Sequence, residues 1–119
     1  MSPIVKAGSL ECAAFKDFAR RMGCRAADLD GARCDGQIEF HHWPPKGSSG
    51  VTRDDRGFAL CHAHHEQAQR YLIPRERQDA WADETRSLFM ERASDHEWKA
   101  YLAARARWIE SRIYVEVPI

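Results

Sequence analysis

Five of the six histidines in this chain fall between residues 41 and 65, and Cys61 lies in the same interval. Cys24 and Cys34 come shortly before it. Imidazole and thiolate groups are the usual protein ligands of zinc and related metals. A chain of 119 residues can bury one core, and domains this small often depend on a metal or a partner for part of their stability. We therefore expect a single domain, residues 1–119, built around bound metal.

The charge balance constrains how the chain could meet a nucleic acid. Lysine plus arginine and aspartate plus glutamate both number 18, so the formal net charge is zero. Domains that bind nucleic acids tightly are usually basic. A local patch of positive charge or a bound cation can do the same work. The composition therefore argues against a uniformly basic surface, and it leaves nucleic-acid binding open.

The first residues, "MSPIVKAGSLECAAF", have neither the charged start nor the apolar core of a signal peptide. No apolar run approaches the roughly 18 residues that a membrane-spanning helix needs. We therefore expect a cytoplasmic protein without a membrane partner, in the host cell cytoplasm if a phage encodes it. In that compartment its four cysteines are metal ligands or free thiols rather than disulfides.

Hydrophobic periodicity predicts an α+β fold in which a β-hairpin is flanked by helices. Residues 10–22 have apolar side chains near helical spacing, and Gly23 is a suitable stop. Residues 37–42 alternate as a strand does, and the Trp-Pro-Pro that follows ends it. A short apolar strand at 57–61 then leads directly into a helix at 62–72.

The last third of the chain is predicted to be a helical extension over residues 74–112. Pro74 suits a helix start, and Ser94 with Glu97 forms a capping box for a second helix. Residues 113–117, "IYVEV", suggest a terminal strand. The apolar stripes of the two helices are expected to be core: Trp81, Thr85, Leu88 and Phe89 in the first, and Trp98, Tyr101, Leu102, Trp108 and Ile109 in the second.

The spacing of three cysteines and a histidine suggests a structural zinc site. Cys61-x-x-His64 stands where the second strand meets its helix, and Cys24 and Cys34 lie in the loop before the first strand. Two ligands from that loop and two from the strand–helix junction would close a tetrahedral zinc site. The alternative is that Cys24 and Cys34 are ordinary buried thiols. Cys12, on the apolar side of the first helix, is expected to be a core residue.

The histidines come in two adjacent pairs whose members must point apart. His41 and His42 lie on opposite sides of a strand, and His64 and His65 diverge by about 100° around a helix. One ion cannot easily use both members of a pair, so the pairs suggest a division of labour. One member of each could bind a metal, which leaves His42 as a base. The alternative is that they are buried only for packing.

Residues 24–70 resemble a known family. A cysteine pair, a strand ending in His-His, a glycine-containing loop and then "LCxxHH" opening a helix is similar to the HNH nucleases with the ββα-metal motif. The closest likeness is to the small phage-type versions with a structural zinc, including the recombinase-associated Ref-like nucleases. The order and spacing of "HHWPPKG…DDRGFALCHAHH" carry the likeness. It implies a ββα-metal, treble-clef-like zinc core, with the helical extension outside it.

The resemblance also implies roles for individual residues. His41 and His65 would bind the catalytic divalent ion (Mg²⁺, Mn²⁺, Zn²⁺ or Ni²⁺), and His42 would be the general base. The structural zinc would be held by Cys24, Cys34, Cys61 and His64. Two positions depart from the family pattern: the middle asparagine falls near Asp55 or Arg56, and Gln69 stands where some members have a third histidine.

These observations lead to two hypotheses from different classes. The first is a metal-dependent HNH endonuclease that hydrolyses DNA, with RNA left open, in phage recombination or DNA processing beside a recombinase partner. Its candidate DNA contacts are Lys46, Arg53 and Arg56. The second is a non-catalytic zinc module that binds nucleic acid or protein. Both use the zinc site, and only the first needs a base beside a second metal. The two departures also leave an inactive family member as an alternative.

Overall fold

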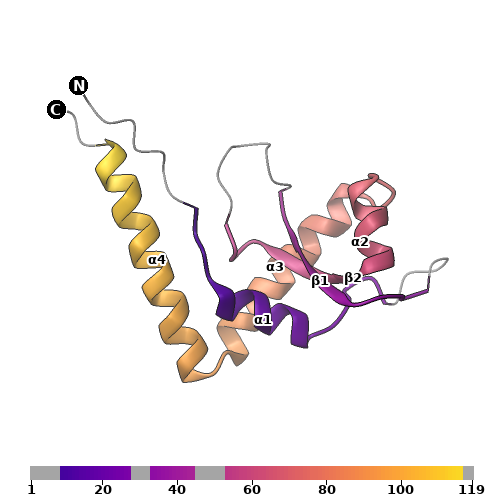
Figure 1. Ribbon diagram of the computed structural model, residues 1–119, viewed down its shortest axis with the longest axis horizontal. Coiled ribbons are helices and arrows are strands. Elements are labelled where there is room, and N and C mark those ends of the chain that lie inside the picture. The colour runs from indigo at the N-terminus through magenta and orange to yellow at the C-terminus, as the bar shows by residue number, and fades with distance from the viewer. Residues whose placement is uncertain (1–8, 28–32, 45–52, 117–119) are drawn as a thin grey trace.

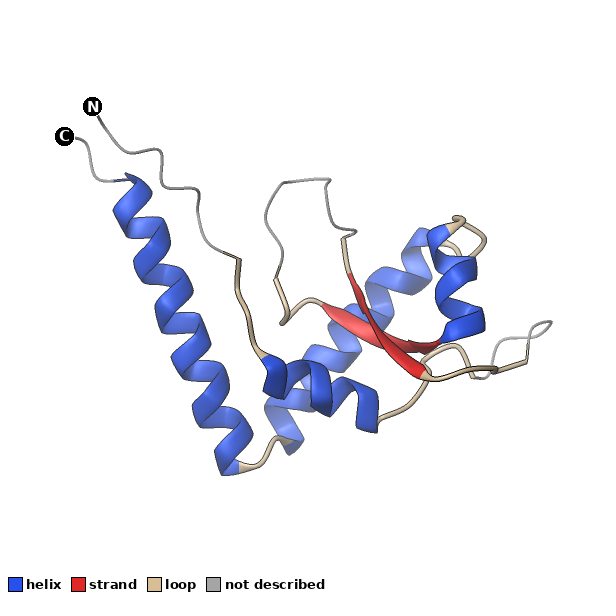
Figure 2. Cartoon of the chain, viewed as in Figure 1, coloured by secondary structure: helices blue, strands red, loops and turns tan. Residues whose placement is uncertain are grey.

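The computed structural model describes residues 9–27, 33–44 and 53–116, with side chains described up to Ser111. These residues form one antiparallel β-hairpin and four helices, the α+β class that the periodicity predicted (Figures 1 and 2). In chain order the elements are α1 (Ala13–Arg21), β1 (Ile38–His42), β2 (Gly57–Cys61), α2 (His62–Gln69), α3 (Arg75–Arg92) and α4 (Asp95–Glu116). Among the described residues, none of the helices combines the length and the apolar character needed to cross a membrane.

The register of the hairpin decides which way each histidine of β1 faces. Ile38 pairs with Cys61 at one end, and His42 pairs with Gly57 at the other. Side chains alternate along a strand, so His41 lies on the same face as Phe58, and its ring centroid is 5.2 Å from that of Phe58. His42 lies on the opposite face. The opposed orientation expected from the sequence is therefore present.

Gly57 allows the two strands to close beside the histidines. Its φ is +152°, and a Cβ at this position would lie 2.3 Å from the carbonyl oxygen of His41. No other residue type could fit there without displacing the backbone of β1. The end of the hairpin, where the histidines stand, thus depends on this close approach.

Two hydrophobic clusters cover the two faces of the hairpin. The helix α1 packs against both strands and against α4, and α3 packs against β2 (Figure 1). On one side Phe15 of α1 meets Phe40 edge to face, and on the other Phe58 meets Trp81 of α3. The first cluster comprises Leu10, Cys12, Phe15, Phe18, Phe89, Tyr101 and Ala104, and the second Ala26, Phe58, Leu60, Ala68, Ile73, Trp81 and Ala82. Cys12 is a core residue, as predicted.

The ends of the helices follow their sequence signals. Gly23, with φ +83°, ends α1 and donates its N–H to the carbonyl of Arg20. The capping box before α4 is present: the Ser94 amide donates to the Glu97 carboxylate at 3.0 Å, and the Glu97 amide donates to the Ser94 hydroxyl at 3.1 Å. These caps fix where α1 ends and where α4 begins.

Two expectations for the last helix are wrong. The strand predicted at 113–117 is absent from 113–116, because α4 continues to Glu116, and residue 117 lies outside the described residues. No proline or glycine interrupts the chain there, so nothing stops the helix. The apolar stripe of α4 is also only partly core. Tyr101 is buried, but Trp98, Leu102 and Ile109 are exposed, since α4 packs along one face.

Candidate metal centres

Three cysteines and one histidine meet where β2 passes into α2. Their ligand atoms all lie within 4.8 Å of one another. The Nδ1 atom of His64 is 3.4 Å from the sulfur of Cys24, 3.7 Å from that of Cys34 and 3.1 Å from that of Cys61. In a tetrahedral zinc site with ordinary Zn–S and Zn–N bonds, a nitrogen and a sulfur are about 3.6 Å apart. The four residues are therefore close enough to hold a metal ion and are consistent with a structural zinc, as predicted.

Backbone hydrogen bonds bring the two distant cysteines to this junction. The amide of Arg25, directly after Cys24, donates to the carbonyl of Ala59 in β2 at 3.0 Å. The amide of Ala63 in α2 donates to the carbonyl of Asp35, directly after Cys34, at 3.1 Å. Each loop cysteine is thus tied to the element that carries the other half of the site.

Without a bound cation, the thiols of this cluster disfavour one another's deprotonation. Burial raises the pKa of the Cys61 thiol, but backbone hydrogen bonds from His64 and Asp35 outweigh it and bring this pKa to about 7. Desolvation and the neighbouring thiols of Cys24 and Cys61 raise the pKa of Cys34 to about 12. Three thiolates therefore cannot coexist near neutral pH unless a cation compensates their charge. A bound divalent ion supplies that compensation.

A pair of imidazoles, His41 of β1 and His65 of α2, forms a second candidate centre beside the Cys/His cluster. Their ring centroids are 5.0 Å apart. His41 is buried, and burial, followed by the charge of His65, lowers its pKa to about 4 despite a hydrogen bond to Gln78. A neutral imidazole can donate a lone pair to a metal. His41 is therefore neutral near pH 7 and chemically suited to be a ligand.

Gln78 of α3 determines which nitrogen of His41 carries the proton. Its amide nitrogen donates to the carbonyl of Ile73 at 3.1 Å, so its amide oxygen is the atom 3.1 Å from His41 Nε2. An oxygen can only accept, and His41 Nε2 must therefore be the N–H. The lone pair of the neutral ring then lies on Nδ1. Gln78 is almost completely buried, which holds this arrangement in place.

Glu39 determines which nitrogen of His65 carries the proton, and here it is Nδ1 and not Nε2. Its carboxylate accepts a hydrogen bond from His65 Nδ1 at 2.8 Å, and a second histidine, His62, donates to it at 3.2 Å. These bonds, that of His65 first, lower the pKa of Glu39 and keep it ionised. The lone pair of a neutral His65 therefore lies on Nε2. A carboxylate behind a histidine is the usual support of a metal-binding imidazole.

His42 is paired with a carboxylate that the sequence patterns did not single out. Its Nε2 donates to Asp54 at 2.8 Å, and the same carboxylate accepts from the backbone amide of Cys12 at 2.8 Å and lies 3.7 Å from Lys16 Nζ. Burial alone would raise the pKa of Asp54, but these three partners outweigh it and lower this pKa. The ionised carboxylate holds the proton on His42 Nε2, which leaves the lone pair on Nδ1.

His41 and His42 face opposite ways but open onto the same cavity. It has a volume of about 400 Å³ and is lined by Phe40, His41, His42, His65, Ala68, Gln69 and Tyr71. Gln69, which stands where some HNH nucleases have a third histidine, also lines this cavity. At its rim Tyr71 is 83% exposed and has a φ of +60°, a conformation that is costly for a tyrosine. Strain of this kind often gathers around functional sites.

The three candidate DNA contacts, Lys46, Arg53 and Arg56, differ in how far they are already engaged within the protein. Lys46 lies outside the described residues. Arg53 makes two hydrogen bonds to Asp55, and its guanidinium lies 4.4 Å from the centroid of the Trp108 ring, so it already joins this loop to α4. Arg56 is exposed. Asp55, near the unmatched asparagine position, is fully buried and also accepts from the hydroxyl of Tyr101.

Comparison with known proteins adds no assignment. No family model matches the chain, and neither a curated protein nor a solved structure matches it. The proposed function therefore rests on the residues of this chain and their geometry.

Proposed function

We propose that this chain is a metal-dependent endonuclease of the HNH type that hydrolyses the phosphodiester bonds of DNA. His41 and His65 would bind the catalytic divalent ion, His42 would be the general base, and the Cys/His cluster would hold a structural zinc. A role in phage recombination or DNA processing, with a recombinase as partner, belongs to the same proposal and comes from the resemblance alone.

One observation carries the proposal. Three histidines line a single cavity, and each is oriented by a different polar side chain. Two of these partners, Asp54 and Glu39, are carboxylates, which are the usual orienting groups of catalytic and metal-binding imidazoles. Two imidazoles 5.0 Å apart, centroid to centroid, suit one ion that keeps open positions for water and phosphate. A third imidazole backed by a carboxylate suits a proton acceptor.

The chemistry assigned to these residues follows from their protonation. Nδ1 of His42 would take a proton from water as the water oxygen bonds to phosphorus and the bond to the leaving oxygen breaks. Asp54 would keep the ring in the reactive tautomer and stabilise the imidazolium that forms. A divalent ion bound to His41 and His65 would neutralise charge on the phosphate and the leaving oxygen.

A non-catalytic zinc module is the second candidate, and the Cys/His cluster favours it equally. Such a module would bind nucleic acid or protein through a surface held in shape by zinc. It has no use for the arrangement around His42. The two candidates therefore differ in what the loss of that one side chain does.

The test is cleavage of supercoiled plasmid by the purified full chain with Mg²⁺, Mn²⁺, Zn²⁺ or Ni²⁺. His42→Ala should lower the rate about 10²–10⁴-fold, the usual effect of losing a general base, while metal content and DNA binding stay near wild type. The matched control is His96→Ala, since His96 is an exposed histidine in α4. Cleavage by His42→Ala at the wild-type rate, or no cleavage by wild type with any ion, would favour the zinc module.

A further inference from the structure

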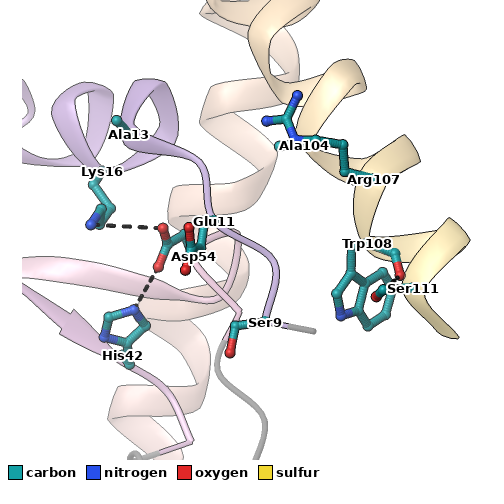
Figure 3. A pocket seen from close by; sticks show the side chains of 10 residues that line it. All are labelled: Ser9, Glu11, Ala13, Lys16, His42, Asp54, Ala104, Arg107, Trp108 and Ser111. Carbon is teal, nitrogen blue, oxygen red and sulfur yellow. Dashed lines mark hydrogen bonds and ion pairs between the residues drawn. The ribbon is translucent and has the colours of Figure 1, made fainter. Parts of the chain in front are cut away.

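A second, larger cavity begins on the other side of His42. It has a volume of about 700 Å³ and lies between the segment before α1 and the helix α4. Figure 3 shows Lys16, His42 and Asp54 on one side of it and the side chains of α4 on the other. Its lining also includes Ser9, Glu11, Arg107, Trp108 and Ser111. His42 is the residue that lines both cavities and so joins them.

The lining combines an aromatic ring, hydroxyl groups and charges of both signs. Trp108 of α4 supplies the ring, and the guanidinium of Arg53, which does not line the cavity, lies over it at 4.4 Å from the ring centroid. Lys16 and Arg107 supply positive charge. Glu11 and Asp54 are the carboxylates, and Asp54 is already engaged by His42, Lys16 and the Cys12 amide. The cavity therefore has no excess of positive charge, and a ligand must gain from stacking as well as from its phosphate.

We propose that this cavity binds one unpaired nucleotide next to the phosphate that is cut. The inference rests on the proposed nuclease function and adds the form of the substrate. A nucleotide has a flat base for the Trp108 ring and a phosphate for Arg107 and Lys16. Because His42 separates the two cavities, a strand crossing it would place one phosphate at the histidines and the adjoining nucleotide here.

A paired base could not enter such a recess, because its edge and both faces are occupied within a duplex. Proteins that take a nucleotide into a pocket act on single strands or turn the nucleotide out of the helix. Stacking on an aromatic side chain accepts any base. The chain should therefore prefer single-stranded or locally opened DNA and show little sequence preference at this position.

The test follows the indole N–H signals of the full zinc-loaded chain by ¹H–¹⁵N NMR, with no other divalent ion added. The probes are 5′-phosphorylated tetrathymidylate and a blunt 12-base-pair duplex. The chain has four tryptophans, and Trp108→Phe identifies the signal of Trp108. Tetrathymidylate should shift the Trp108 signal and leave that of Trp81, in the other cluster, in place. Arg107→Gln should raise the dissociation constant about three- to tenfold, because one ion pair with the phosphate is lost. Arg105→Gln, an exposed arginine of the same helix that does not line the cavity, should not.

Each outcome bears on the cavity separately from the nuclease activity, which plasmid cleavage measures. If the Trp108 signal stays in place while the protein cuts plasmid, the cavity proposal fails and the nuclease proposal stands. A duplex that shifts the Trp108 signal as strongly as tetrathymidylate overturns the unpaired nucleotide. If Arg107→Gln and Arg105→Gln bind alike, the nucleotide lies elsewhere. A shift confined to Trp108 in a chain that cuts nothing would support the cavity and count against the nuclease.

Discussion

The two candidate metal centres use adjacent residues of α2, His64 and His65, and yet they are built differently. In the Cys/His cluster four ligand atoms lie within 4.8 Å of one another, and His64 is fully buried. In the histidine pair two imidazoles line an open cavity, and each is oriented by a polar side chain behind it. A closed set of four ligands leaves no position for a substrate, whereas two ligands leave several. We infer that the first centre serves the fold and the second serves chemistry.

The largest effect should come from removing a ligand of the cluster. Cys61→Ser should lose one zinc equivalent and most of the cooperative unfolding transition, because structural-zinc binding is also folding free energy, on the order of several kcal/mol here. Metal analysis and thermal melting measure both. Cys12→Ser is the control. Cys12 is buried in a hydrophobic cluster away from the Cys/His cluster, so this variant should keep its zinc. A Cys61→Ser protein with full zinc and an unchanged melting temperature would show that the Cys/His cluster is not a structural zinc site.

The next largest effect should fall on Asp54. Asp54→Asn removes the charge that holds the His42 tautomer, and we expect single-turnover cleavage to slow by roughly 10²-fold or more. Binding of DNA should stay near wild type, and Asp54→Glu should recover part of the rate. Equal losses of binding and of rate in Asp54→Asn would mean that the carboxylate serves only the fold.

The same substitution should change how stability depends on pH. The folded state lowers the pKa of Asp54, so its carboxylate stabilises the fold above the ordinary carboxyl pKa of about 4, and this contribution is lost as the pH falls through the folded value. The difference in unfolding free energy between wild type and Asp54→Asn should therefore shrink in acid. A difference that is constant from pH 7 to pH 3 would contradict the assignment.

Glu39 gives a smaller and more selective effect. Glu39→Gln should weaken binding of the second ion about 10–100-fold, because the carboxylate orients His65, and should leave the zinc content unchanged. Isothermal titration with Mn²⁺ measures this. Glu66→Gln is the matched control, as Glu66 is exposed and lies near His62 rather than His65. If the two variants bind Mn²⁺ equally well, Glu39 has no part in a metal site.

The smallest effect concerns the strained rim of the histidine cavity. Tyr71→Gly should raise the free energy of unfolding by roughly 0.5–1 kcal/mol, because glycine adopts a positive φ at little cost. Denaturant titration would show it. A variant less stable than wild type would show that Tyr71 is held by contacts and not strained.

Local patterns predicted the hairpin, most of the helices and the Cys/His cluster, but they could not predict contacts between residues far apart in the sequence. The strand 57–61 and the set Cys24, Cys34, Cys61 and His64 follow from spacing and periodicity, since the ligands flank a hairpin. The partners of the histidines could not be found in this way. Asp54 stands in a loop before β2, and Gln78 lies on α3, outside the motif, so only folding brings them to His42 and His41.

The helix α4 shows that the sequence pattern also could not predict which apolar side chains are buried. Its apolar residues predicted a core stripe, but burial depends on what packs against a helix, and α4 meets its neighbours along one face. Hence Tyr101 is buried while Trp98 is exposed. Spacing indicates which side chains share a face, and tertiary contacts decide which face is covered.

The most direct test of the division of labour compares His64→Ala with His65→Ala, two neighbouring substitutions of the same kind. For each protein the zinc equivalents, the melting temperature, the binding of Mn²⁺ and the cleavage of plasmid would be measured together. His64→Ala should lose zinc and melt at a much lower temperature. His65→Ala should keep zinc and the wild-type melting temperature but lose Mn²⁺ binding and cleavage, with partial recovery at excess Mn²⁺. If the two variants lose zinc, stability and cleavage alike, there is one metal centre rather than two, and the account is wrong.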